Sequence, residues 1–411
     1  MPARFQAPRG TFDVLPSDQP PRERLVALAT DLLGRAGYGR IETPIFEDTA
    51  LFARSVGEST DVVRKEMFTF TDRGGRSVTL RPEGTAPICR AYVERGMHRL
   101  AQPVKLWYAG PYFRYEAPQA GRYRQFHQLG AEAIGSDSPL VDAELILLLD
   151  ELLAGMGVEA RELRIGSLGS PAARSEYREE LRAHLRAHES ELAKEVRERI
   201  DENPLRAFDA ADRGTQAVMA DAPTMLARLD DADAEHFAEV RSLLDAAGVD
   251  YSVEPRLVRG LDYYTRTLFE FHSSALGAQS QLAGGGRYDS LVAELGGPST
   301  PAAGWAAGVE RIVLAAATAP PPPRPDVFVV AAGEAERARA LGVASELRRA
   351  GLAAEADLAG RGLKGQLKHA DRIGARRVVI LEDRSAKLRE MDSGEQRPIE
   401  LAEVVAELTR R

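Results

Sequence analysis

A run of four prolines, Pro320–Pro323, divides this chain of 411 residues into two parts. Proline cannot continue a helix, and consecutive prolines form a stiff, extended spacer. We therefore predict a Pro-rich linker at residues 321–325, between a large domain at residues 1–320 and a small domain at residues 326–411. Because 44% of the residues are hydrophobic, each part can bury a core of its own.

Hydrophobic patterning after the linker predicts a small α/β domain. Apolar strands are expected at residues 327–330 and 377–381, and amphipathic helices at residues 334–350 and 363–373. Strands that alternate with helices at this spacing usually pair in parallel. We therefore expect a mostly parallel sheet in this part of the chain.

The large domain has a different pattern, which predicts an α+β fold. A helix is expected at residues 20–35, and residues 170–247 are charged and helical, with few strand signals. Strands are expected at residues 41–43, 67–70, 78–81, 104–116, 124–134, 163–168, 263–272 and 279–283. Four of these strands follow one another closely between residues 67 and 134, which favours an antiparallel sheet. The segment 170–247 is then a helical insertion in this sheet domain.

Charge, apolar runs and cysteine content indicate which partners and which cellular compartment to expect. The formal net charge is −8, but residues 324–411 hold 17 lysines and arginines against 15 aspartates and glutamates, a weak indication of an RNA partner. No run approaches the roughly 18 apolar residues that span a bilayer, and no secretory signal is visible, so we expect no membrane partner. The single cysteine, Cys89, is interpreted as a buried core residue. Together these features indicate the cytoplasm.

Arginines inside longer motifs are the candidates for chemistry, because the chain is too rich in arginine for an isolated one to be informative. Arg114 lies where two strands, residues 113–116 and 122–128, are joined by a polar loop that contains Gly121. The α-phosphate of ATP needs a rigid donor of this kind, and the planar guanidinium group keeps its charge. The alternative is a surface hairpin with ion pairs.

Two more segments are informative because of their order along the chain. Residues 304–311 (GWAAGVER) are expected to form a helix of small residues that allows close approach, with Arg311 projecting towards a site. The alternative there is a packed core helix with one exposed arginine. The pair Thr43–Pro44, at the end of a strand after the long first helix, is unremarkable by itself.

In chain order, these three segments resemble motifs one, two and three of the class II aminoacyl-tRNA synthetases. Residues 259–265 (RGLDYYT) and residues 284–289 (GGGRYD) resemble the two histidine-specific motifs of the histidyl-tRNA synthetase family. Residues 80–85 and 119–132 also match that family, and residues 363–371 resemble its anticodon-binding domain. The resemblance covers nearly the full chain and is weakest in the helical insertion.

The resemblance implies an antiparallel class II catalytic domain that ligates L-histidine to tRNA(His) through a histidyl-adenylate, with ATP and Mg²⁺. Arg114 and Arg259 are the implied catalytic residues, and the implied ATP contacts are Arg114, Glu116, Arg259 and Arg311. The implied histidine contacts are Glu83, Gly84, Thr85, Arg114, Gln128, Glu132, Arg259, Tyr263, Tyr264, Gly284, Gly285, Gly286, Tyr288 and Gly304. The acceptor end of the tRNA would meet Gln119 and Arg124. The Mg²⁺ ligands stay unassigned, and the family implies a homodimer formed through the motif-one region.

Several alternatives stay open at this point. A synthetase-like regulatory subunit of histidine biosynthesis would share the fold but lack the C-terminal domain, and a non-catalytic RNA-binding module would not activate an amino acid. Glu83, which follows Pro82, could be an ordinary acidic residue at a helix N-terminus. Ala117 stands where the family usually has an arginine, which removes one expected contact to the tRNA acceptor end.

Overall fold

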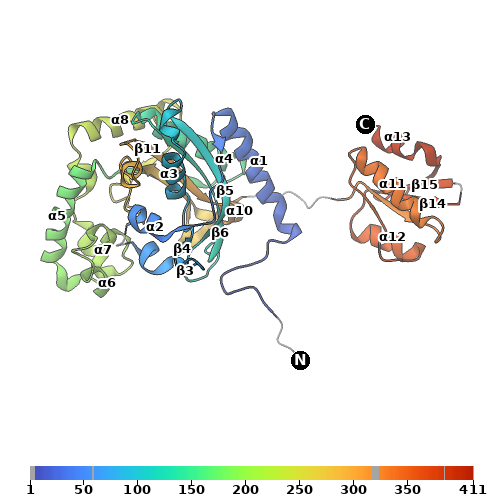
Figure 1. Cartoon of the computed structure of the whole chain (residues 1–411), viewed down its shortest axis with the longest axis horizontal. Coiled ribbons are helices and arrows are strands. Elements are labelled where there is room, and N and C mark those ends of the chain that lie inside the picture. Colours follow the sequence, from blue (N-terminus) through green and yellow to red (C-terminus); the bar gives the residue numbers. More distant parts are fainter. Residues whose placement is uncertain (1–4, 58–59, 317–323, 384, 411) are drawn as a thin grey trace. The chain divides into compact units, whose positions relative to one another are not determined.

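The computed structural model describes residues 5–57, 60–316, 324–383 and 385–410. Contacts within the chain divide it into two units, Met1–Pro320 and Pro321–Arg411, which are both drawn in Figure 1. Residues 321–323 of the predicted linker lie outside the described residues.

The first unit is built on a sheet of eight strands (Figure 1). In spatial order these strands are β1 (Gly39–Arg40), β5 (Val104–Phe113), β6 (Gln125–Ile134), β11 (Ala302–Gly308), β10 (Gln281–Arg287), β9 (Thr265–Ser273), β7 (Arg161–Ser167) and β8 (Ser252–Val253). All pairs from β5 to β7 are antiparallel, and the short edge strands β1 and β8 pair in parallel. This order joins segments that are far apart in sequence.

Helices lie on both faces of this sheet and in a segment beside it. They are α1 (Gln19–Arg35), α2 (Thr49–Val56), α3 (Thr85–Glu94), α4 (Pro139–Gly155), α5 (Pro171–Ala187), α6 (Lys194–Arg197), α7 (Arg213–Ala220), α8 (Asp231–Ala246), α9 (Leu291–Glu294) and α10 (Val309–Ala315). The prediction of a long first helix is confirmed by α1.

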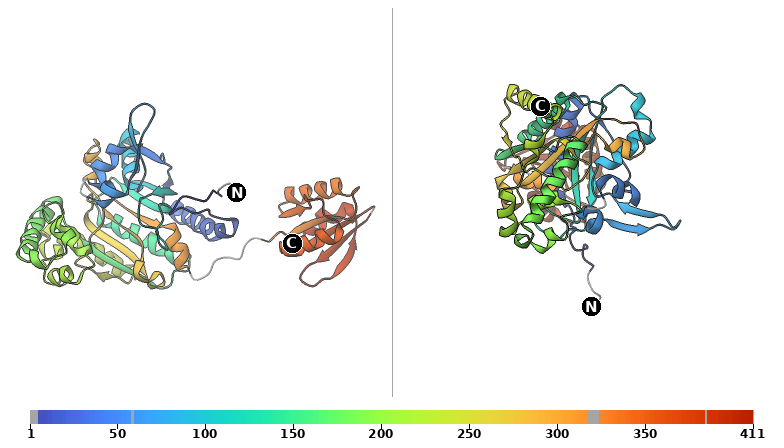
Figure 2. Two further views of the ribbon diagram at one scale, coloured as in Figure 1. Left: turned by 90° about the horizontal axis from the view of Figure 1, so that it is seen from below. Right: turned by 90° about the vertical axis from the view of Figure 1, so that its left-hand side faces the viewer.

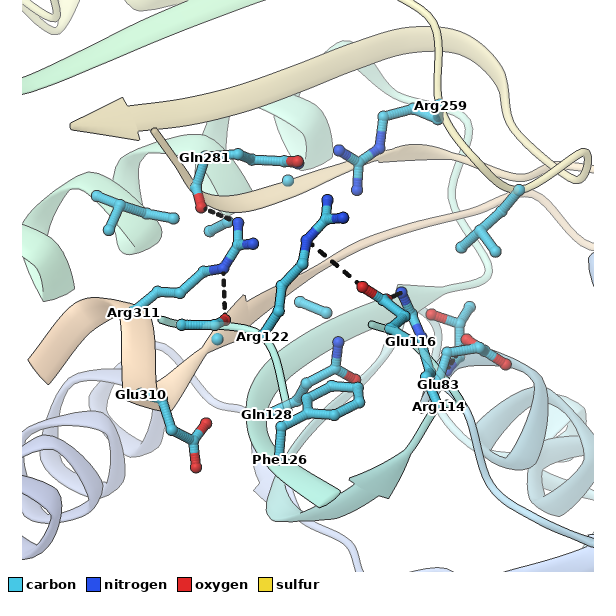
Figure 3. A pocket seen from close by; sticks show the side chains of 18 of the residues that line it. Glu83, Arg114, Glu116, Arg122, Phe126, Gln128, Arg259, Gln281, Glu310 and Arg311 are labelled. Carbon is cyan, nitrogen blue, oxygen red and sulfur yellow. Dashed lines mark hydrogen bonds and ion pairs between the residues drawn. The ribbon is translucent and has the colours of Figure 1, made fainter. Parts of the chain in front are cut away.

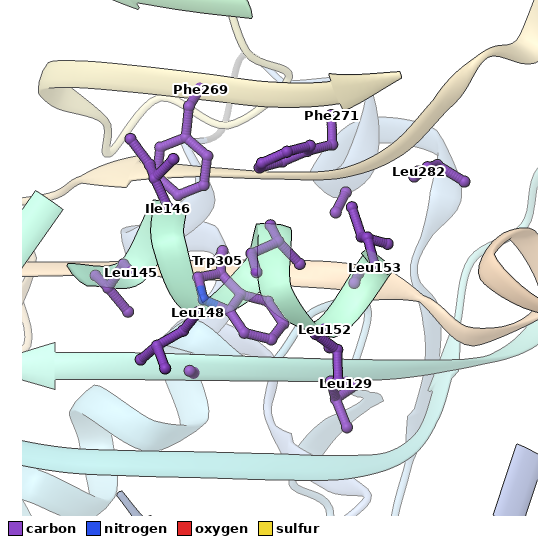
Figure 4. Packing of buried hydrophobic residues seen from close by; sticks show 14 of the residues in the cluster. Leu129, Leu145, Ile146, Leu148, Leu152, Leu153, Phe269, Phe271, Leu282 and Trp305 are labelled. Carbon is purple, nitrogen blue, oxygen red and sulfur yellow. The ribbon is translucent and has the colours of Figure 1, made fainter. Parts of the chain in front are cut away.

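The leucine-rich helix α4 packs on one face of the sheet (Figure 4). Pro139 opens the helix, and the Ser138 hydroxyl accepts a hydrogen bond from the Leu140 amide, which satisfies one N–H group at the helix start. Its apolar side chains are buried with Trp305 of β11 and Phe271 of β9. This packing forms the main hydrophobic core of the unit.

The opposite face of the sheet has a different composition. Helix α3 packs there, and the buried cluster is rich in tyrosine, with Tyr108 of β5 and Tyr288 after β10 among its members. Successive side chains of a strand point to opposite faces, so β6 sends Leu129 into the leucine-rich core and Gln128 to the tyrosine-rich side. The sheet therefore separates a mainly apolar core from a face that can carry polar chemistry.

Three predictions about the secondary structure are wrong. Residues 41–43, expected to be a strand, follow β1, which ends at Arg40, and belong to no strand. The first two of the four closely spaced strands form a separate three-stranded antiparallel sheet, in the order β2 (Phe46–Asp48), β4 (Ser77–Leu80) and β3 (Phe68–Thr71). Residues 304–308, expected to be helical, belong to strand β11, and α10 begins at Val309. Glycine and alanine in β11 allow neighbouring strands and side chains to approach closely, and this sheet pairing overrides local helix propensity.

Helices α5 to α8 form the segment between β7 and β8, and among described residues 171–246 no strand interrupts them. Helices α5 and α7 share a small apolar core, which includes Tyr177, Leu181 and Leu185 of α5 and Val218 and Met219 of α7, whereas α8 packs on the main core. In the left view of Figure 2 these helices, drawn in green, lie at one end of the first unit. We refer to residues 171–246 as the helical insertion.

The second unit has a five-stranded sheet. Its spatial order is β13 (Ala354–Ala356), β12 (Val327–Ala331), β14 (Arg377–Glu382), β15 (Ser385–Glu390) and β16 (Gln396–Ile399). Its helices are α11 (Arg337–Arg349), α12 (Leu363–Arg372) and α13 (Val404–Thr409). The first three strands are parallel, but β15 and β16 are antiparallel because short connections allow only hairpins. Among the described residues of the whole chain, no helix is both long and apolar enough to cross a bilayer.

Candidate active site

A pocket opens on the tyrosine-rich side of the eight-stranded sheet. Strands β6, β10 and β11 contribute Gln128, Gly284 and Ala306 to it, and the start of α3 and the loop before β9 border it. The sequence predictions that line this pocket are Glu83, Thr85, Arg114, Glu116, Gln128, Arg259, Tyr263, Tyr264, Gly284 and Arg311. Residues from five separate stretches of the chain therefore meet here.

Three arginines from distant segments face this pocket (Figure 3). Arg114 follows β5, Arg259 lies in the loop before β9, and Arg311 is in the first turn of α10. In Figure 3 the guanidinium groups of Arg259 and Arg311 extend into the same space, with Arg122 between them. Several positive charges in one concave site favour a polyanionic ligand.

Backbone oxygens orient two of these arginines. Arg311 donates from Nε to the Gly121 carbonyl oxygen at 3.0 Å and from Nη1 to the Gln281 carbonyl oxygen at 2.6 Å. Arg114 donates from Nε to the Pro82 carbonyl oxygen at 2.9 Å. A guanidinium group has five N–H donors, so these bonds leave donors for an anion. Burial lowers the pKa of Arg311, and the positive charge of Arg122 lowers it further.

Arg259 is paired with an acidic side chain of the sheet. Its Nη1 donates to Oε1 of Glu270 on β9, and its guanidinium carbon lies 5.7 Å from the centre of the Tyr264 ring. His272 and Gln281 also contact the Glu270 carboxylate, at 2.9 Å and 3.1 Å. Burial alone would lower the pKa of Arg259, but the charge of Glu270 raises it. Arg259 therefore stays charged although it is mostly buried.

Glu83 both stabilises a helix start and lines the pocket. Its carboxylate accepts hydrogen bonds from the backbone amides of Thr85 and Ala86, at 2.7 Å and 3.0 Å, so it does stabilise the N-terminus of α3. The same carboxylate lines the pocket, and the Tyr263 hydroxyl lies 3.5 Å from Oε2. Burial raises the pKa of Glu83, although both backbone bonds oppose the shift. The helix start holds this acidic group in place beside the arginines.

Glu132 lies fully buried beneath the pocket. Its Oε1 accepts hydrogen bonds from the hydroxyls of Thr85, at 2.9 Å, and Tyr108, at 3.2 Å, and its Oε2 accepts one from the Tyr288 hydroxyl. Burial raises the pKa of Glu132 to about 8, although these hydroxyls favour the charged form. The three hydroxyls together hold the Glu132 carboxyl group in one orientation relative to Glu83 and the pocket.

Known proteins resemble this chain over almost its whole length. A model of the histidyl-tRNA synthetase family matches residues 10–312, and an anticodon binding domain matches residues 326–411. This chain belongs to the histidyl-tRNA synthetase family.

Individual members of this family match the chain along almost its whole length. Histidine–tRNA ligase from Desulforamulus reducens is 47% identical, over 97% of this chain and 97% of its own length. The enzyme of that name from Nocardia farcinica is 49% identical, over 98% of this chain and 97% of its own. The crystal structure of apo S. aureus histidyl-tRNA synthetase superposes with a TM-score of 0.83 at 35% identity, over 99% of this chain and 100% of that one. The predicted family and the predicted fold class, a class II catalytic domain with a C-terminal α/β domain, are both confirmed.

The three adjacent glycines of this family's second histidine motif have different surroundings. A Cβ atom on Gly284 would lie 2.6 Å from Nη1 of Arg259, so this glycine makes room for the arginine. Gly285 points to the opposite face, where a Cβ atom would meet Phe269 and Trp305 at 2.7 Å. Strand alternation explains the difference, and it places Gly285 away from the pocket in which the resemblance put it.

Other residues implied by the family motifs also lie outside the set that lines the pocket. They are Gly84, Glu132, Gly286, Tyr288 and Gly304 from the histidine set, and Gln119 and Arg124 from the acceptor-end set. Gln119 pairs with Arg122 across a tight turn, and the Arg124 guanidinium carbon lies 3.7 Å from the centre of the Tyr115 ring. This turn extends the motif-two hairpin beside the pocket.

Several residues that line the pocket were missed by the sequence analysis: Arg122, Tyr123, Phe126, Gln281 and Glu310. Phe126 could have been found, because it precedes Gln128 by two residues and shares its face of β6. Glu310 points away from the arginines in Figure 3, and it accepts hydrogen bonds from the His127 amide and from Arg22, each at 3.0 Å. Arg122 stands in the stretch 119–132 that matches the family, so it too could have been found, whereas no sequence pattern signalled Gln281.

The family implies Mg²⁺ together with ATP. Among the residues that the structure describes, no three His, Cys, Asp or Glu side chains gather as a metal site. Glu116 nevertheless lines the pocket with a buried Oε2 that has no hydrogen-bond partner in the described structure, although the Arg122 Nε lies 3.4 Å away. A Mg²⁺ ion that bridges phosphates needs only one or two protein carboxylates. The donor set therefore fits such an ion.

Proposed function

We propose that this chain ligates L-histidine to tRNA(His) in two steps, with ATP as the energy source and a histidyl-adenylate as the intermediate. The observation that carries the proposal is that Arg114, Arg259 and Arg311 face one pocket, which also contains Glu83 and Gln128. Positive groups for a polyphosphate thus stand beside polar groups that suit an amino acid.

In the first step, a carboxylate oxygen of histidine attacks the α-phosphorus of ATP, and pyrophosphate leaves. Arg259 and Arg114 would donate N–H groups to the α-phosphate as negative charge grows there, and Arg311 would bind the γ-phosphate. The substrate itself supplies the nucleophile, so the protein contributes position and charge stabilisation. The rigid backbone contacts of Arg114 and Arg311 suit this task, because a preorganised donor needs no rearrangement during the reaction.

Recognition of histidine requires acceptors for its ammonium group and partners for both imidazole nitrogens. Glu83 and Gln128 would accept from the ammonium group. Tyr264 and Glu132 would select the imidazole ring. Thr85 would hold Glu132 in place through its hydrogen bond to that side chain. A site built from such bonds rejects amino acids that would leave its buried polar groups unpaired.

Residues in and beside the pocket would contact the metal ion and the tRNA. Glu116 would hold Mg²⁺ next to the phosphates, where the ion supplies further neutralisation of their charge. Gln119 and Arg124 would contact the acceptor end of the tRNA, and the unit at residues 326–411 would bind the anticodon. Because Ala117 replaces the usual arginine, we expect one phosphate contact fewer at the acceptor end.

The direct test is exchange of pyrophosphate into ATP, measured with each of the twenty amino acids and without tRNA. We expect exchange with histidine alone. Exchange with a different amino acid would overturn the specificity, and no exchange with any amino acid would favour the regulatory subunit or the RNA-binding module. Charging of tRNA(His) by the same preparation then tests the second step.

We also propose a homodimer and a cytoplasmic location, as the family resemblance implies. Light scattering should give twice the mass of one chain. A fully active monomer would contradict the first expectation, and fractionation of the source cells would test the second.

A further inference from the structure

The loop that carries Arg259, Tyr263 and Tyr264 is held by the helical insertion. Arg174, in the first turn of α5, donates from Nη1 to the carbonyl oxygen of Asp262 at 3.2 Å and also to that of Tyr264. Arg206, in a short helix at residues 204–209, donates from Nη2 to the carbonyl oxygen of Gly260 at 3.1 Å. Side chains of the insertion thus contact backbone oxygens immediately beside the residues that line the pocket.

The other side of this loop rests on the end of α2. The Asp262 amide donates to the carbonyl oxygen of Val56 at 3.2 Å. From the insertion, Asn203 donates from Nδ2 to Oδ1 of Asp262 at 3.2 Å. At Gly57, a Cβ atom would lie 2.5 Å from a carboxylate oxygen of Asp262. The loop is therefore enclosed between the body of the catalytic unit and the insertion, and its backbone has little room to move.

The residues just before the insertion and the start of its last helix, α8, are both attached just after the same loop. The Arg266 amide donates to the carbonyl oxygen of Gly169 at 2.8 Å, and Arg266 Nε donates to the buried carboxylate of Asp233 on α8 at 2.9 Å. Asp233 also accepts from the Ser170 amide. Arg266 has a φ angle of 44°, which is unfavourable for a residue with a side chain and persists only where surrounding contacts enforce it. The insertion and strand β9 are thus joined at a constrained point.

We propose that Arg174 and Arg206 are positioning residues, through which the helical insertion holds Arg259 and Tyr264 in the geometry that adenylation requires. This inference rests on the proposed function and deepens it. Arginine suits the role because one guanidinium group can donate to two carbonyl oxygens at once. Burial lowers the pKa of Arg174, and in such surroundings each of these hydrogen bonds is stronger than it would be in water.

The test separates this role from a role in tRNA binding, because pyrophosphate exchange needs no tRNA. We expect Arg174→Ala to reduce kcat/KM for histidine in exchange on the order of 10- to 100-fold, since displacement of a catalytic group by about 1 Å has effects of this size. Arg206→Ala should act in the same direction. Arg174→Lys should recover part of the loss, because an ammonium group can still donate to these carbonyl oxygens.

Arg182→Ala is the matched control. Arg182 lies on the same helix, two turns beyond Arg174, and its partners Glu179 and Asp201 belong to the insertion. It should leave the exchange rate unchanged. Thermal unfolding of each variant identifies loss of the fold, and if Arg174→Ala unfolds, the Arg206→Ala and Arg174→Lys variants decide the question.

Full exchange activity in folded Arg174→Ala and Arg206→Ala variants would overturn the inference. So would a defect that appears only in tRNA charging, because the insertion would then act on the tRNA. Both results leave the proposed function intact, provided that the wild-type protein shows histidine-dependent exchange. Absence of exchange in the wild type would contradict the proposed function instead.

Discussion

Gly304 of β11 lies directly opposite Glu132 of β6, and a Cβ atom at position 304 would fall 1.7 Å from Oε2 of Glu132. The same Cβ atom would lie 2.6 Å from the Ala131 carbonyl oxygen. A side chain of any size is therefore excluded at this point. The Glu132 carboxyl group can therefore lie beneath the pocket only because residue 304 on the neighbouring strand has no side chain.

Gly304→Ala should destabilise the fold and disturb Glu132. We expect the free energy of unfolding to fall by about 1–3 kcal/mol, because the clash forces shifts in a packed region. Urea denaturation measures this effect. Gly342→Ala in α11, where the new Cβ atom meets nothing within 4 Å, is the control and should stabilise slightly. An unchanged midpoint for Gly304→Ala would contradict the packing described for β11.

Glu132 should make stability depend on pH in a defined direction. Burial raises its pKa in the folded protein to about 8, so the folded state keeps a proton that the unfolded state loses at a lower pH. Stability from this group is present at low pH and decreases as the pH rises from about 4 to about 8. Glu132→Gln removes the titration, so its unfolding free energy relative to wild type should increase across this range. A pH-independent difference would contradict the raised pKa.

Arg259→Ala should separate catalysis from stability. We expect exchange to fall on the order of 10²- to 10³-fold, as for other groups that stabilise charge in a transition state. The fold should persist, but the unfolding free energy should drop by about 1–3 kcal/mol, because buried Glu270 loses its cation. The double variant Arg259→Ala with Glu270→Gln should regain stability but not activity.

Arg256→Ala, in the same loop, is the control for that experiment. Its side chain is exposed and donates to the Ala220 carbonyl oxygen, outside the pocket. It should retain exchange activity. Near-normal exchange by Arg259→Ala would remove Arg259 from the catalytic residues.

Cys89 should be inert in the folded protein. It is fully buried in α3, and burial raises the pKa of its thiol, with Glu132 and Glu83 adding to the shift. A thiolate is the reactive form, so a thiol reagent should modify the native protein slowly and the denatured protein at one site. Rapid labelling without unfolding would show that α3 opens readily. The sequence interpretation of Cys89 as a core residue agrees with its burial.

Much of the candidate site was predictable from local sequence. Arg114, Arg259 and Arg311 each stand in a motif of distinctive residues, and those motifs identified the family before any contact was known. Glu270 was not predicted, because no local pattern sets it apart from the many other charged residues of the chain. Residues 304–308 were wrongly expected to be helical, because their small side chains suit a close-packed helix as well as a central strand.

The sequence by itself determined the family, the position of the change between the two parts of the chain, and the chemical identity of many groups that line the pocket. Those properties reside in residue types and their spacing along the chain. The tertiary structure alone decided which groups meet. Strand register places Gly284 at the pocket and Gly285 on the opposite face, and long-range packing pairs Arg259 with Glu270 and attaches the insertion to the loop. Contacts of this kind depend on how distant segments pair, and no local pattern specifies that pairing.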